Sequence, residues 1–189
     1  MDAVREYQKS EIINGVEYAM SPPSTKHRAI QGNLFALIFA FLQGKRCKVF
    51  FEHEVVLDEE NVYQPDILVV CDPKKIKGNH IEGAPDFVAE ILSPSTKKRD
   101  ITVKKKAYEK YGVKEYWIIS QDESIEVYRL GEDSKYELDN VYQNFTEYEW
   151  SRMTEKERSE QSPSLKLSLY DDLEIEVKDI FEDVNFFEE

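Results

Sequence analysis

The segment Ala84–Asp100, APDFVAEILSPSTKKRD, constrains the fold more than any other part of the chain. Its first half has the pattern of a buried strand, because apolar residues continue almost without interruption up to Leu92. One carboxylate, Glu90, interrupts that run. An ionised carboxylate is costly to bury unless it is paired, hydrogen-bonded or bound to a metal ion. A dense cluster of positive charge follows, so the fold has to explain why Glu90 stands there.

Helical and extended patterns alternate along the rest of the chain. Apolar residues at helical spacing predict a helix that begins at Ser24 or Thr25 and ends near Gly44. Two β-branched and aromatic runs, KVFFEHEVVLD and VYQPDILVVCD, predict two strands joined by a turn at residues 58–61. DFVAEILS predicts a third strand, STKKRDITVKKKAYEKYG a helix closed by Gly112, and EYWIIS a fourth strand.

The resulting order α-β-β-β-α-β predicts an α/β (α+β) fold with a central mixed sheet flanked by helices. Added hairpins are expected around EIINGVEYAM, where Asn-Gly supplies the turn, and from SIEVYRLG to KYELDNVYQ. The chain has 189 residues and no Gly/Pro/Ser-rich linker, which predicts a single domain. We expect a core at about 24–121, an N-terminal hairpin in 1–23, and C-terminal strands with a tail in 122–189.

Charge is distributed unevenly. The chain carries 25 basic and 38 acidic residues, a net charge of −13, which at first sight argues against a nucleic-acid partner. Residues 97–114 reverse this balance, with eight basic residues against two acidic ones. A positive patch in an acidic chain indicates a specific anionic partner, and a solvated lysine-rich helix face is the alternative.

Two further patterns bear on location and on the cysteines. The longest apolar run, Leu34–Leu42, is about half of the roughly 20 residues that span a bilayer, and the N-terminus has no apolar leader. We therefore expect a cytoplasmic protein with no membrane partner. Cys47 and Cys71 are isolated from each other and from the histidines, which indicates neither a zinc site nor a disulfide framework. We expect both to be buried small apolar residues.

Asp66 and Glu90 are two acidic residues at positions where strands should be buried. The 24 residues between them (90 − 66 = 24) allow a strand, a loop and a return strand, so both carboxylates can face one cleft. They would repel each other unless a cation lies between them, and oxygen ligands without histidine or cysteine suit Mg²⁺ or Mn²⁺. The alternative pairs Glu90 with a basic residue in a buried salt bridge and makes Asp66 a strand-start cap.

The helix after the third strand favours the metal site. Asp100, Lys104 and Tyr108 are spaced i, i+4, i+8 and share one helix face, from which Lys105 and Lys106 project away. A carboxylate pair that binds a divalent cation, with a lysine nearby, suits hydrolysis of a phosphodiester. The metal polarises the phosphoryl oxygen, and the ammonium orients water or stabilises charge.

These residues resemble a known signature. Pro65-Asp66 followed by EIL with Glu90 is similar to the PD-(D/E)XK phosphodiesterase signature. The blocks NGVEYAMSPPSTKH, QPDILVV, EILSPST and YGVKEYWII resemble the Uma2-type family of restriction endonucleases in that superfamily. The resemblance covers about residues 11–119 and implies a restriction-endonuclease-like core and endonuclease activity. The superfamily lysine is expected at Leu92, and the resemblance implies its replacement by Lys104 from the following helix.

These considerations give the expected site. Asp66, Glu90 and Lys104 are the expected catalytic residues, with the metal ion held by Asp66, Glu90 and Ile91. The accessory candidates are Glu52, Asp100, Tyr108 and His27. For Glu52 the role would be an outer metal ligand, and for His27 a helix-terminal histidine without chemistry is the alternative. The expected nucleic-acid-binding residues are Lys97, Lys98, Arg99, Lys105 and Lys106.

The expected function is that of a divalent-metal-dependent endonuclease acting on DNA, using Mg²⁺ or Mn²⁺. A homodimer is expected, because cutting both strands of a duplex is easiest with two sites. Two alternatives remain: a nucleic-acid-binding module on a decayed nuclease fold, which Leu92 favours, and a partner-binding scaffold that uses the acidic surface.

Overall fold

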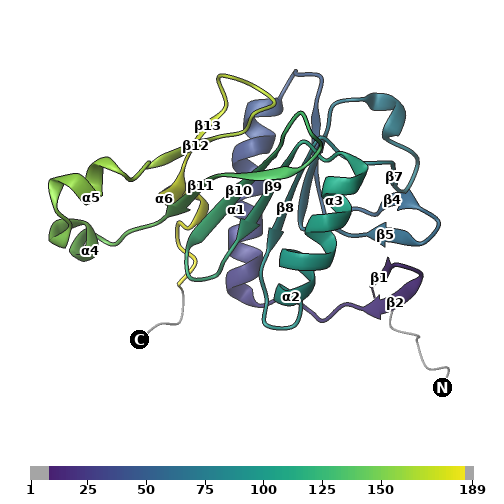
Figure 1. Ribbon diagram of the computed structural model, residues 1–189, viewed down its shortest axis with the longest axis horizontal. Coiled ribbons are helices and arrows are strands. Elements are labelled where there is room, and N and C mark those ends of the chain that lie inside the picture. Colours follow the sequence, from purple (N-terminus) through teal and green to yellow (C-terminus); the bar gives the residue numbers. More distant parts are fainter. Residues whose placement is uncertain (1–8, 186–189) are drawn as a thin grey trace.

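The computed structural model describes residues 9–185. A six-stranded sheet forms its centre, with a smaller sheet beside it (Figure 1). The large sheet has the order β11 (Tyr136–Gln143), β10 (Ser124–Leu130), β9 (Glu115–Ile119), β8 (Phe87–Ile91), β6 (Ile67–Val70) and β3 (Lys48–Phe51). The small sheet has the order β2 (Val16–Ala19), β1 (Ser10–Ile13), β5 (Asn61–Tyr63), β4 (Val55–Asp58) and β7 (Ile81–Glu82).

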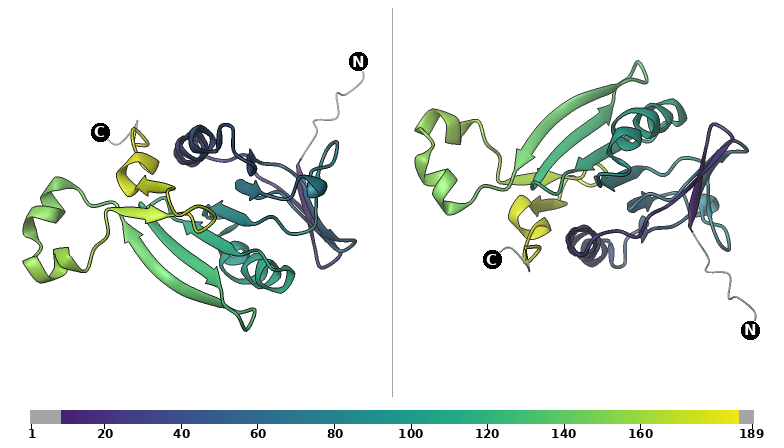
Figure 2. Two further views of the ribbon diagram at one scale, coloured as in Figure 1. Left: turned by 90° about the horizontal axis from the view of Figure 1, so that it is seen from above. Right: turned by 90° about the horizontal axis from the view of Figure 1, so that it is seen from below.

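Helices cover both faces of the large sheet, as two further views show (Figure 2). One face packs against α1 (Thr25–Leu42), and the other against a π-helical turn η2 (Asp100–Lys104) and α3 (Lys105–Tyr111). The short α2 (Lys97–Arg99) directly precedes η2. Strand β8 divides its side chains between these layers, because successive residues point to opposite faces. Ala89 and Ile91 join the core cluster beneath α1, whereas Val88 and Leu92 join the cluster with α3 and the small sheet.

The predicted α-β-β-β-α-β order is confirmed by α1, β3, β6, β8, α3 and β9. Each of the two long strand predictions, however, breaks into two strands that belong to different sheets. The first breaks at Glu52, whose φ of 45° leaves the extended region. The second breaks around Pro65, which has no N–H to donate to a strand ladder. The chain thus crosses from the large sheet to the small one and returns just before Asp66.

Turn and cap predictions agree with the structure. Asn14 (φ 51°) and Gly15 (φ 76°) form the turn between β1 and β2, and β10 pairs with β11 as the second hairpin. Ser24 caps α1 by accepting a hydrogen bond from the backbone N–H of His27, and Gly112 ends α3 at φ 84°. Residues 1–8 of the predicted N-terminal region lie outside the described residues, and the single-domain division stays a prediction.

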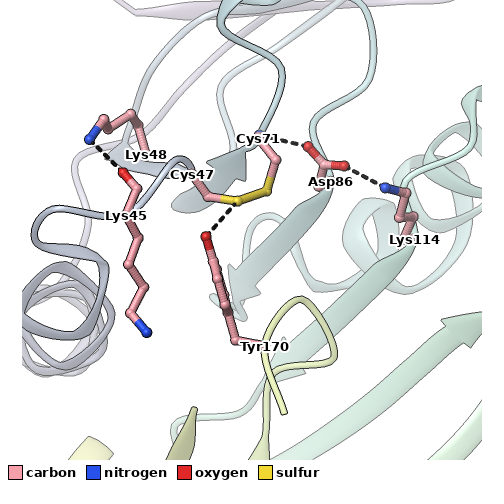
Figure 3. The surroundings of a disulfide bond; sticks show 7 residues. All are labelled: Lys45, Cys47, Lys48, Cys71, Asp86, Lys114 and Tyr170. Carbon is pink, nitrogen blue, oxygen red and sulfur yellow. Dashed lines mark hydrogen bonds and ion pairs between the residues drawn. A yellow bond between two sulfur atoms is a disulfide. The ribbon is translucent and has the colours of Figure 1, made fainter. Parts of the chain in front are cut away.

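The prediction for the cysteines is wrong: Cys47 and Cys71 form a disulfide (Figure 3). Strands β3 and β6 are antiparallel with Lys48 opposite Val70, so one further step along the ladder brings the two cysteines face to face. The sequence alone does not show which residues of β3 and β6 lie opposite each other. Cys47 is buried, as expected, whereas Cys71 is half-buried, and the Tyr170 hydroxyl donates to Cys47 Sγ at 3.2 Å.

The C-terminal part adds elements outside the core. Two short helices, α4 (Glu147–Arg152) and α5 (Glu155–Ser159), form an arm that extends away from both sheets (Figure 1). The chain returns through the pair β12 (Ser164–Lys166) and β13 (Glu174–Glu176), and α6 (Val177–Ile180) packs against α1. A short 3₁₀ helix η1 (Pro73–Lys75) precedes β7. Within residues 9–185, no helix has the length and apolar character that a membrane crossing requires.

Candidate active site

A pocket of about 490 Å³ lies where strands β6 and β8 meet the start of α1 and the π-helical turn. Its walls include two Ser- and Pro-containing loops, residues 20–24 and 93–96. The ionisable side chains that line it are His27, Glu52, Asp66, Glu90, Asp100 and Lys104. The structure therefore brings the three expected catalytic residues and three of the accessory candidates to one cavity.

Glu90 is 3% exposed and lies on the α3 side of the sheet. Its Oε1 atom accepts hydrogen bonds from Lys104 Nζ at 3.0 Å and from the Tyr108 hydroxyl at 2.8 Å. Burial raises the pKa of Glu90 well above its usual value, and neighbouring carboxylates, first Asp100 and then Asp66, raise it further, against the opposing effect of Lys104. Both donors use Oε1, so Oε2 is the oxygen left for another ligand.

Lys104 is buried among three carboxylates. Its Nζ atom lies 2.7 Å from Glu11 Oε1, 3.0 Å from Glu90 Oε1 and 3.5 Å from Asp100 Oδ1. Burial alone would lower the pKa of Lys104, but the carboxylates outweigh it and hold that pKa well above the ordinary range. The carboxylates therefore favour the charged ammonium form of Lys104.

Asp66 is held from both sides. Its Oδ1 atom lies 3.0 Å from His27 Nε2, and its Oδ2 accepts the Ile91 backbone N–H at 2.7 Å. The Gln31 side-chain amide also donates to the Asp66 carbonyl at 2.9 Å. Because a carboxylate only accepts, His27 presents its proton on Nε2. The first turn of α1 thus fixes the orientation of Asp66.

The π-helical turn aims Asp100 and Lys104 into the pocket. Both side chains are buried, as is Tyr108 one turn further, so the three residues share the face that their spacing predicts. π-Helical turns occur frequently at functional sites. Lys105 projects elsewhere, with Nζ 3.2 Å from the centre of the Tyr128 ring, and Lys106 is exposed.

Glu11 is a site residue that sequence reasoning missed. It is 2% exposed, binds Lys104, and accepts the Gln64 backbone N–H at 3.0 Å. The signal available in the sequence was strand alternation: Glu11 lies two residues before Ile13, so both side chains point to the same face of β1. In the structure both are buried. That signal identifies a buried acid, yet it does not say that this acid meets a lysine 93 residues later (104 − 11 = 93).

Leu92, at the position expected for the superfamily lysine, is an apolar core residue. Its side chain is 7% exposed and joins the cluster that contains Val88 and Tyr108. Leu92 lies on the same sheet face as Glu90, so it packs beneath the helix that supplies Lys104. The lysine in the pocket thus comes from the helix and not from the strand.

The expected nucleic-acid-binding residues fall into two groups. Lys97, Lys98 and Lys106 are exposed, and the first two directly follow the pocket-lining Thr96. Arg99 lies over the Tyr18 ring at 4.9 Å, and Lys105 is occupied by Tyr128 as described above. Of these five residues, the exposed Lys97 and Lys98 lie at one lip of the pocket, next to Thr96.

The oxygen donors at the site are of the kind that hard divalent cations prefer. Four buried acidic side chains, from Glu11, Asp66, Glu90 and Asp100, lie at or beside the pocket with one lysine and one histidine, so acidic groups outnumber basic ones. Burial is the largest cause that raises the pKa of Asp100, and neighbouring acids raise it further, as they do that of Glu90. Asp100 Oδ1 is buried without a hydrogen-bond partner among the described residues. In residues 9–185, no group of three or more His, Cys, Asp and Glu side chains is arranged to hold a metal ion. A cation here would need Asp66, Glu90 and a backbone oxygen such as that of Ile91.

Comparison with known proteins places this fold in the class of restriction-endonuclease-like proteins. A solved chain from Anabaena variabilis, described as a putative nuclease belonging to DUF820, superposes with a TM-score of 0.68 at 23% identity, over 93% of this chain and 91% of that one. That likeness shows the fold. Residues 2–167 match the Uma2 family, described as "Putative restriction endonuclease", and the chain belongs to that family.

A curated relative from Synechocystis sp., described as an uncharacterized protein, is 29% identical over 125 residues, 65% of this chain. The chain spans 66% of the length of that relative. Its description gives no activity that could be compared with the pocket.

Proposed function

We propose that this chain is a divalent-metal-dependent endonuclease that hydrolyses DNA phosphodiester bonds at the pocket of Asp66, Glu90 and Lys104. One observation carries the proposal: Lys104 reaches Glu90 at 3.0 Å from the helix side, beside Asp66, where Leu92 leaves the strand without a lysine. Membership of a nuclease family supports it.

Asp66 and Glu90, with the Ile91 carbonyl, would hold Mg²⁺ or Mn²⁺. When bound, the ion would polarise a phosphoryl oxygen and lower the pKa of a water molecule. His27 and the Ile91 N–H orient Asp66, and Tyr108 orients Glu90. The Lys104 ammonium would position the attacking water or stabilise negative charge on the phosphoryl oxygens. Glu11 and Asp100 keep that ammonium charged and in place.

The exposed lysines at the pocket lip would bind the DNA backbone. DNA affinity should fall steeply with salt, and changing Lys97 and Lys98 to Ser should reduce the slope of log K against log salt by about 0.9 for each phosphate that the variant no longer neutralises. Lys114→Ser is a matched control, because Lys114 pairs with Asp86 at 2.7 Å beside the disulfide (Figure 3). An equal change in salt slope for Lys114→Ser would indicate that DNA binds somewhere other than the pocket lip.

The test of activity is incubation of purified protein with supercoiled plasmid, linear duplex, single-stranded DNA and RNA, with Mg²⁺, Mn²⁺ or chelator. Metal-dependent cleavage of DNA that disappears in Asp66→Asn is the expected result, and the variant controls for contaminating nuclease. Binding without cleavage would favour the decayed nucleic-acid-binding module. Absence of both binding and cleavage would favour the partner-binding scaffold. A homodimer belongs to this proposal, and light scattering of the same samples measures it.

A further inference from the structure

A second charged cluster lies at the pocket wall, outside the Asp66, Glu90 and Lys104 group. The Glu52 carboxylate pairs with two cations: Lys9 Nζ at Oε2 and Arg28 Nη1 at Oε1. The Glu52 side chain is 14% exposed, whereas those of Lys9 and Arg28 are 41% and 45% exposed. The acid is thus the inner member of the cluster and lines the pocket, and its two cations are more exposed to solvent.

The backbone holds Glu52 in this place. Its φ of 45° lies in the left-handed region, which non-glycine residues seldom adopt and which is often retained at functional sites. The Glu52 N–H donates to the carbonyls of Pro65 and Asp66 at 3.1 and 3.2 Å. The residue that carries the acid is therefore attached to the same strand end as the expected metal ligand Asp66.

Arg28 is connected to the same strand end from the helix side. Its Nη1 also donates to Gln31 Oε1 at 2.9 Å, and the Gln31 amide donates to the Asp66 carbonyl at 2.9 Å. Gln31 thus sets the position of the guanidinium relative to Asp66. Each oxygen of Glu52 receives one cation, as the two non-bridging oxygens of a phosphodiester would.

We propose that Lys9 and Arg28 form a binding site for a backbone phosphate of the nucleic acid, and that Glu52 occupies this site when no substrate is bound. A phosphate entering the pocket mouth displaces the Glu52 carboxylate and takes over both cations. The inference rests on the proposed function, since it assigns a subsite of the same pocket. It makes Glu52 a competitor of the substrate and not an outer metal ligand.

The direction in which Glu52→Gln changes DNA affinity tests this proposal. Binding of a fluorescent DNA duplex is measured by anisotropy in chelator, at several salt concentrations. Glu52→Gln should bind about three- to tenfold more tightly than the wild type, because two partly exposed ion pairs no longer compete. Arg28→Gln and Lys9→Ser should each weaken binding and reduce the salt slope. Glu52→Gln combined with Arg28→Gln should lose most of the gain.

Glu54→Gln is the matched control, because it removes the same charge two residues away on the same segment. Equal tightening by Glu54→Gln would overturn the inference in favour of a general charge effect. Unchanged or weaker DNA binding by Glu52→Gln would also overturn the inference. If cleavage were lost while binding stayed unchanged, Glu52 would be assigned instead as an outer metal ligand. Tighter binding without any cleavage would sustain this subsite while the nuclease proposal fails. Absence of binding to any nucleic acid would overturn both.

Discussion

Two buried glutamates on neighbouring parallel strands, Glu90 on β8 and Glu115 on β9, differ in the groups that surround their carboxyl oxygens. Glu115 is fully buried on the α1 side of the sheet. Its Oε1 accepts from Trp117 Nε1 at 2.6 Å, and its Oε2 accepts the Ser168 backbone N–H at 2.8 Å. Glu90 instead shares a pocket with a lysine and further carboxylates.

The pKa of both acids is raised, and burial is the largest cause in each. A raised pKa therefore does not separate a functional acid from a structural one in this chain. The difference lies in the partners. Neutral donors satisfy both oxygens of Glu115 and attach the C-terminal segment to the sheet, whereas the acids around Glu90 outnumber their cations. The excess of acidic over basic side chains in a pocket is what distinguishes the surroundings of Glu90 from those of Glu115.

The largest expected effect separates the two glutamates by activity. Glu90→Gln should reduce metal-dependent plasmid cleavage by more than about 100-fold, because the proposed metal ligand is lost. Its thermal stability in chelator should hold or rise, since repulsion between carboxylates is relieved. Glu115→Gln should cleave at the wild-type rate per folded molecule. Equal losses of activity in the two variants would remove the distinction.

Lys104→Ala should lower the cleavage rate by about 100- to 1,000-fold, because the ammonium proposed to position the water or stabilise the phosphoryl oxygens is lost. It should also destabilise the metal-free protein by about 3–5 kcal/mol, because three buried carboxylates lose their cation, and Mg²⁺ should restore part of that loss. Denaturant unfolding with and without Mg²⁺ measures this. Lys105→Ala is the control, since Lys105 lies over Tyr128. Full activity in Lys104→Ala would exclude it from the reaction.

Glu115→Gln should lower the free energy of unfolding by about 1–3 kcal/mol, because the NH2 group that replaces one carboxylate oxygen cannot accept the hydrogen bond from Trp117 or Ser168 at that position. Burial raises the pKa of Glu115, so the folded state holds a proton that the unfolded state releases above about pH 4.5. This contribution to stability is complete below pH 4.5 and is lost as pH rises through the folded pKa. Urea unfolding from pH 4 to 8 should show a flatter pH dependence in the variant. An unchanged pH dependence would contradict this account.

The smallest effects come from removing one donor from each glutamate. Tyr108→Phe deletes the hydroxyl that binds Glu90 and should lower activity by about tenfold, with a stability loss of about 0.5–1.5 kcal/mol. Trp117→Phe deletes the indole N–H that binds Glu115 and should lower stability alone. Single-turnover cleavage and urea midpoints, measured on both variants, give the four values needed. The comparison fails if Trp117→Phe affects catalysis more than Tyr108→Phe does.

Local patterns in the sequence predict the element order and much of the pocket. The apolar runs around Asp66 and Glu90 mark neighbouring strands, and helical spacing brings Asp100, Lys104 and Tyr108 to one face. Glu11 could not be assigned in this way, because its contact with Lys104 joins a strand of the small sheet to the π-helical turn. Such contacts depend on how the small sheet packs against the helix, and no periodicity in a short window records that.

The split of the two long strands shows the same limit. Residues 48–58 have a continuous β pattern, but the chain changes sheets within them at Glu52, a residue type with no general preference for positive φ. Sequence therefore predicts that strands are present more reliably than it predicts which sheet they join.

The Cys47–Cys71 disulfide makes part of this architecture dependent on the oxidation state of its surroundings. The bond closes the loop between β3 and β6, which contains β4 and β5 of the small sheet and ends just after the strand that follows Asp66. Closing a loop with a sequence separation of 24 removes unfolded-state entropy worth about 3 kcal/mol in the chain-entropy view. Disulfides of this kind are rare in the cytosol. In a reducing compartment the two sulfurs would be thiols, and hydrogen bonds and packing alone would then hold this loop closed.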